Sequence, residues 1–166
     1  TYHTLLLHAL SVFALFVLWM LHHYEFHYLT RASGALAWLN GLLLLLLAVA
    51  PVTTSLLDGF ASSRVAVLLY ELNLLSMMLL LLFVWRHAVG AGLLFGSDIP
   101  SRTVQRMRLA LSLGVTALLI IVAVAAVLPN VSLVLTFMLF VVYAVVTARG
   151  GYTLELRRSR NAAADL

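Results

Sequence analysis

Three histidines that follow an apolar run are the side chains of this sequence best suited to chemistry. His22, His23 and His27 come directly after the run that ends at Leu21, within the stretch His-His-Tyr-Glu-Phe-His. Imidazoles at the rim of a hydrophobic segment can bind a metal or haem iron, conduct protons, or form hydrogen bonds between helices. The choice among these roles depends on the elements that surround them.

A second polar group lies inside an apolar segment. Glu71 is followed closely by Asn73 and Ser76 in a run of leucines and methionines. An ionised carboxylate is costly at that depth in a membrane and usually faces protein or water. These membrane-embedded polar side chains can help subunits assemble or tune the outer mouth of a pore. Alternatively, Glu71 reaches the membrane–water interface or pairs with Arg64.

The remaining side chains do not suggest enzyme chemistry. The sequence contains no cysteine, no intramembrane nucleophile beside a base, no paired aspartates and no metalloprotease motif. We therefore expect no catalytic residue, no cofactor, no metal site and no enzymatic activity.

The elements that position these side chains follow from composition. The 166 residues are 64% apolar and 10% charged, which is typical of an integral membrane protein. A spanning helix needs about 20 apolar residues. Five segments qualify and predict an all-α membrane bundle: Leu5–Leu21, Ala35–Leu57, Val65–Trp85, Leu109–Leu128 and Val131–Ala148. Residues 1–152 would then form one transmembrane domain, followed by a tail over 153–166.

The arginines predict the orientation. Nine lie on one side of the predicted spans and only Arg64 on the other, and basic residues are retained in cytoplasmic loops. We therefore expect a multi-pass cell-membrane protein with a cytoplasmic C-terminus that contacts anionic lipid and not nucleic acid. Five crossings place Thr1 outside, without an initiator Met or an export signal, so we expect a sixth helix before Thr1.

Several motifs between His22 and Leu82, with a dipeptide just beyond, carry a family resemblance. They are His22-His23-x-x-Phe26, Trp38-Leu39-Asn40, Pro51-x-Thr53-x-x-Leu56-Leu57, Leu69-Tyr70-x-Leu72-Asn73-Leu74-Leu75 and Trp85-Arg86. Together they resemble the bacterial branch of the transmembrane protein 175 family of potassium channels. The resemblance implies six helices per subunit and a homotetramer around one potassium-permeable pore, without the Thr-Val-Gly-Tyr-Gly filter.

The resemblance also implies a role for residues near the first predicted turn. The family's first helix lines the pore and carries Arg-x-x-x-Phe-Ser-Asp, a motif that does not occur in this sequence. His22 and His23 end one predicted helix and Trp38 and Asn40 begin the next, so we expect all four to meet. The resemblance makes them a scaffold for the pore helix; the alternative is that the histidines are wetted interfacial residues.

Two other functions remain open at this point. A membrane haem protein that carries electrons needs two histidines on different helices at matching depth, and His22 or His23 can face His87 in this way. A non-conducting structural or assembly protein needs only the leucine-rich helix faces. A Soret band would indicate the first, and an absence of ion flux the second.

Overall fold

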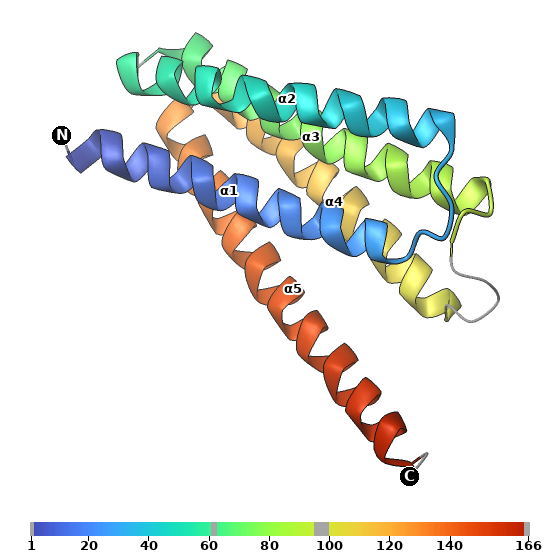
Figure 1. The fold of residues 1–166 in the computed structure, drawn as a ribbon. Coiled ribbons are helices and arrows are strands. Elements are labelled where there is room, and N and C mark those ends of the chain that lie inside the picture. Colours follow the sequence, from blue (N-terminus) through green and yellow to red (C-terminus); the bar gives the residue numbers. More distant parts are fainter. Residues whose placement is uncertain (1, 61–62, 95–99, 165–166) are drawn as a thin grey trace.

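Five helices account for almost all of the chain (Figure 1). The computed structural model describes residues 2–60, 63–94 and 100–164, and it describes the backbone alone at His3 and from 150 to 164. The helices are α1 (Tyr2–His27), α2 (Gly34–Gly59), α3 (Arg64–Gly90), α4 (Ser101–Ala125) and α5 (Pro129–Ala164). Each contains a stretch that is long and apolar enough to cross a membrane. The predicted all-α membrane bundle is confirmed.

Helix α3 is the centre of the bundle. It contacts each of the other four helices, most extensively α2 and α4. Its side chains Met78 and Leu81 are completely buried, and they belong to one core that also contains Leu57 of α2, Leu118 of α4 and Phe140 of α5. By contrast, α2 buries few of its residues and exposes much of its apolar surface.

The helix ends differ from the ends predicted from hydropathy. Helix α1 ends at His27 and not at Leu21, α3 ends at Gly90 and not at Trp85, and α4 begins at Ser101 and not at Leu109. Hydropathy marks the part of a helix that crosses hydrocarbon, whereas the helix itself can continue through polar residues beyond it; at α3 and α4 a glycine or a proline lies near the observed end. Gly92, with φ 63°, follows α3, and Pro100 precedes α4.

The last two helices differ from prediction at their C-terminal ends and at the turn between them. Helix α4 ends at Ala125, before the predicted Leu128, and α5 begins at Pro129, a residue that suits the first turn of a helix. Helix α5 continues to Ala164, past the predicted end at Ala148, so most of the predicted tail is helical.

The connection after α1 is bonded to the end of α3. The backbone N–H of Thr30 donates to the carbonyl oxygen of Leu93 at 2.9 Å, and the Thr30 hydroxyl donates to the same oxygen at 3.0 Å. Leu29 and Leu94 form an isolated antiparallel bridge beside it. The α1–α2 connection is therefore joined to the segment that follows α3.

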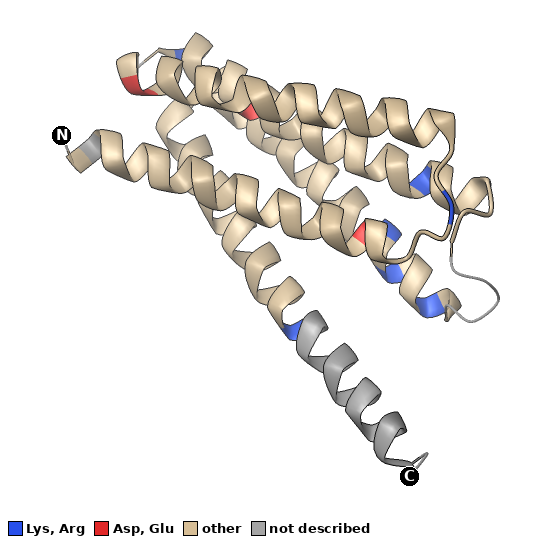
Figure 2. Cartoon of the chain, in the orientation of Figure 1, with Lys and Arg blue, Asp and Glu red and all other residues tan. Residues whose placement is uncertain are grey.

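Arginines gather at one end of the bundle (Figure 2). We call this the arginine-rich end; α1 and α3 finish there, and α2 and α4 begin there. Its described arginines are Arg31, Arg86, Arg102, Arg106, Arg108 and Arg149. The opposite end has Arg64 at the start of α3.

Candidate functional site

His22 and Asn40 pair across the α1–α2 hairpin. The Nε2 atom of His22 lies 2.9 Å from Oδ1 of Asn40, and both side chains are partly buried. Because an amide oxygen only accepts hydrogen bonds, the Nε2–H of His22 is the donor. The His22 ring also packs against Phe26, with centroids 4.2 Å apart. The predicted meeting of these two residues is confirmed.

His23 and Trp38 do not join that pair. His23 is exposed and stacks on Trp19 of its own helix, with ring centroids 5.6 Å apart. Trp38 has 79% of its surface exposed. Neighbouring residues on a helix point about 100° apart, so His22 and His23 cannot both face α2, and the same geometry turns Trp38 away from Asn40. The prediction that all four side chains meet is therefore wrong for these two.

His87 lies on α3, beyond the end predicted for that span at Trp85. Its Nε2 is 3.1 Å from the hydroxyl of Ser33, which also accepts a hydrogen bond from the backbone N–H of Leu36 at the start of α2. His87 thus bonds α3 to the N-terminus of α2, while His22 bonds α1 to Asn40. The two imidazoles are directed to different protein partners and not to a common ligand.

Glu71 connects α3 to α5. Its carboxylate is completely buried and accepts a hydrogen bond from the hydroxyl of Thr136, whose oxygen lies 2.8 and 2.9 Å from the two carboxylate oxygens. Both alternatives that kept Glu71 near the surface, reaching the interface or pairing with Arg64, are therefore wrong. Asn73 is buried as well, and Ser76 donates to the Leu72 carbonyl of its own helix at 2.7 Å.

A buried chain of hydroxyls joins three helices in the half of the bundle near Arg64. Thr54 of α2 donates to Ser11 of α1 at 3.0 Å, and Ser11 donates to the hydroxyl of Tyr70 on α3 at 3.4 Å. Thr54 also bonds the carbonyl of Ala50 in its own helix at 2.9 Å. These bonds fix α1 against the hairpin of α2 and α3.

Glu25 is a polar residue that the sequence reading overlooked. It is completely buried, and neither carboxylate oxygen has a hydrogen-bond partner among the described residues. It lies on the buried face of α1, one helical turn after Leu21 and one turn before Tyr28, which directly follows the helix. The ring of Tyr28 packs edge-on against Trp85. The signal was present, because Leu21, Glu25 and Tyr28 follow helical spacing. A buried carboxyl without a partner is costly, so Glu25 is an unusual residue in this position.

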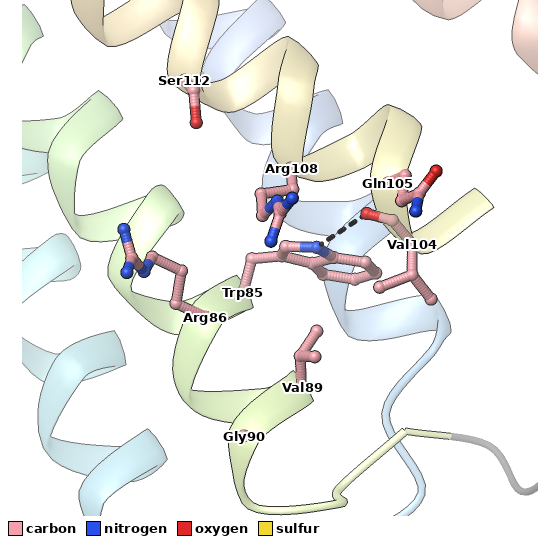
Figure 3. A pocket seen from close by; sticks show the side chains of 8 residues that line it. All are labelled: Trp85, Arg86, Val89, Gly90, Val104, Gln105, Arg108 and Ser112. Atoms are coloured by element: carbon pink, nitrogen blue, oxygen red, sulfur yellow. Dashed lines mark hydrogen bonds between the residues drawn. The ribbon is translucent and has the colours of Figure 1, made fainter. Parts of the chain in front are cut away.

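Two hollows lie at the arginine-rich end. One, of about 380 Å³, lies between the end of α3 and the start of α4 (Figure 3). The other, of about 270 Å³, lies among α1, α4 and α5 and is lined by Tyr24, Arg106 and Tyr143, among others. The hydroxyl of Tyr24 donates to the backbone of Thr147 and that of Tyr143 to the backbone of Ala110, so both tyrosines also hold α5 in place.

Comparison with known proteins gives one similarity in sequence and one in structure. No family model matches the sequence. A protein of Streptomyces collinus that is named a potassium channel is 33% identical over 114 residues, which make up 64% of this chain and 55% of the relative. The chain thus spans about half the length of that relative.

The structural comparison decides the fold. The crystal structure of a lysosomal potassium-selective channel TMEM175 homologue from Chamaesiphon minutus matches with a TM-score of 0.77. The predicted resemblance to the transmembrane protein 175 family is confirmed at the level of the fold. The match covers 86% of this chain and 72% of that channel, at 24% identity. The TMEM175 fold therefore extends well beyond the motifs between His22 and Leu82 and includes helices whose sequences show little more than apolar character.

Proposed function

We propose that this chain is a subunit of a potassium-permeable cation channel. The proposal is carried by the fold match to a channel described as potassium-selective, over 86% of this chain. The Streptomyces collinus relative, named a potassium channel, supports it independently through sequence. The helical spans are consistent with a protein that acts in the bilayer.

The proposed assembly is a homotetramer around one pore, lined mainly by a helix that precedes α1. The face of the α1–α2 hairpin that carries His22 and Asn40 supports this arrangement. Their hydrogen-bonded pair is only partly buried, so its face can receive a further helix. Polar groups at membrane depth are stable when another helix covers and satisfies them.

The chemistry of the pair suits a supporting role. With Nε2–H donating to Asn40, a neutral His22 keeps Nδ1 as an acceptor, and the amide nitrogen of Asn40 keeps its donors. The pair can therefore hold a hydroxyl, a carboxylate or a guanidinium on an adjacent helix. We propose that His22 and Asn40 orient the pore helix through such bonds, that Trp38 supports assembly from the opposite face of α2, and that His23 serves at the rim.

Reconstitution of the full-length gene product in liposomes tests the proposal. We expect potassium flux that exceeds sodium flux, and a tetramer in detergent or nanodiscs. Absence of monovalent-cation flux from a folded tetramer would favour the structural or assembly protein instead. Asn40→Ala and Trp38→Ala should reduce assembly or total flux without changing ion preference. Ser76→Ala is the matched control, since among the described residues its hydroxyl bonds only to the Leu72 carbonyl of its own helix.

We also propose that the arginine-rich end faces the cytoplasm, in accordance with the positive-inside rule. The chain contains no cysteine, so single cysteines give an unambiguous label. In intact cells, a membrane-impermeant maleimide should react with Arg64→Cys and leave Arg102→Cys unlabelled. The reverse pattern would overturn the orientation.

A further inference from the structure

The hollow between α3 and α4 has the features of an anion site. Its volume is about 380 Å³, and Figure 3 shows its walls. The lining residues are Trp85, Arg86, Val89 and Gly90 of α3 and Val104, Gln105, Arg108 and Ser112 of α4. One arginine comes from each helix, so the hollow has a guanidinium on each of two walls.

The side chains around the hollow are arranged for a small anionic group. In Figure 3, Arg86 and Arg108 lie on opposite sides of the space, and the hydroxyl of Ser112 points into it from one turn further along α4. The floor is rigid because Trp85 is almost completely buried and its indole N–H donates to the Val104 carbonyl at 3.4 Å. Two guanidinium groups and a hydroxyl offer donors from several directions to one acceptor group.

The described acidic side chains do not neutralise these two arginines. Glu25 and Glu71 are completely buried, the first without a hydrogen-bond partner and the second bonded to Thr136. Asp58 lies near the C-terminus of α2, at the opposite end of the bundle. Both Arg86 and Arg108 are exposed. As far as the described side chains are concerned, the positive charge of the hollow therefore remains available to a ligand.

We propose that this hollow binds a phosphate group held between Arg86 and Arg108. Planar guanidinium groups match phosphate oxygens in geometry and charge. The arginine-rich end lies where lipid headgroups meet the helices, and basic hollows between membrane helices suit anionic headgroups. Val89 and Val104 give the hollow apolar walls for the glycerol and upper acyl region. A lipid headgroup is thus the favoured source of the phosphate, with free phosphate as the other source. This site requires that the arginine-rich end lies at the membrane surface, and it does not require that the protein conducts ions.

Native mass spectrometry of the full-length protein with added phosphatidylglycerol tests the site. Each guanidinium that contacts the phosphate directly contributes about a fivefold factor in binding, so Arg86→Gln with Arg108→Gln should weaken binding about 25-fold, whereas arginines without that contact contribute little. The matched control is Arg31→Gln with Arg149→Gln, which removes the same charge from exposed positions at the same end, outside both hollows. The control should bind within about twofold of the unmodified protein.

Additional measurements identify the source of the phosphate, and single variants replace the double variant if it fails to fold. Millimolar inorganic phosphate that binds to the protein, and is lost in the Arg86/Arg108 double variant, would identify free phosphate as the ligand. Phosphatidylglycerol binding that phosphate does not displace identifies the headgroup. If the double variant fails to fold, each single variant should weaken binding about fivefold. Equal lipid binding by folded hollow variants and control would overturn the proposal.

Discussion

The contact between Glu71 and Thr136 provides a sharp test of how α3 and α5 are held together. Both side chains are completely buried, and the Thr136 hydroxyl lies 2.8 and 2.9 Å from the two carboxylate oxygens. Thr136→Val keeps the shape of the side chain and removes the donor. The carboxyl group of Glu71 would then remain buried without this partner.

The expected magnitude follows from that burial. Hydrogen bonds between membrane helices contribute about 0.6 kcal/mol on average and up to about 1.7 kcal/mol. A buried acceptor that loses its donor costs about 1–3 kcal/mol. We therefore expect Thr136→Val to lower the free energy of unfolding by about 1–2 kcal/mol. In a Glu71→Leu background, the same substitution should cost less than about 0.5 kcal/mol, because no acceptor is left unsatisfied.

Equilibrium unfolding in mixed detergent micelles gives the four free energies of this double-mutant cycle. Thr116→Val is the matched control, since the exposed Thr116 hydroxyl bonds only to the Ser112 carbonyl of its own helix. The control should change stability by less than about 0.5 kcal/mol. An equal cost of Thr136→Val in both backgrounds would show that the hydrogen bond does not stabilise the contact between α3 and α5.

Three further substitutions have defined effects on the free energy of unfolding, measured in the same assay. Gly114→Ala should lower it by about 1–3 kcal/mol, because the new Cβ would lie 2.6 Å from the Tyr143 hydroxyl; an unchanged value would mean that α4 and α5 separate easily. Glu25→Leu should raise it by about 1–3 kcal/mol by replacing a buried carboxyl group that has no hydrogen-bond partner; a loss would reveal a partner for Glu25. Ser11→Ala should lower it by about 0.5–1.5 kcal/mol by removing the acceptor for Thr54, whereas no loss would show that the hydroxyl chain adds nothing.

The sequence predicted the parts of the structure that depend on local order. Apolar runs close to the length of a membrane span located all five helices, and a short connection between antiparallel helices placed His22 near Asn40. It failed where rotation about a helix axis decides the contact, as for His23 and Trp38. Hydropathy also missed the polar helix ends, since residues such as His27 remain helical outside the hydrocarbon.

Pairings between distant helices were beyond what a single sequence specifies. Glu71 was recognised as unusual, but its partner Thr136 lies on α5, and nothing in the apolar run around Thr136 distinguishes it from other hydroxyls. Glu25 was hidden in a stretch whose histidines drew attention. The hollow between Arg86 and Arg108 could be found only once the packing of α3 against α4 was known. The sequence alone assigns both arginines to topology and lipid contact.

The bonds from Thr30 to Leu93 couple two regions that chain order separates. Any movement of the α1–α2 connection away from α3 must break the two hydrogen bonds from Thr30 to the carbonyl oxygen of Leu93, in the segment that follows α3. His22 lies shortly before Thr30 in the sequence, and Arg86 lies shortly before Leu93. A phosphate bound at Arg86 would therefore act near the bonds that hold the α1–α2 connection, and through them near the start of the helix that carries Asn40.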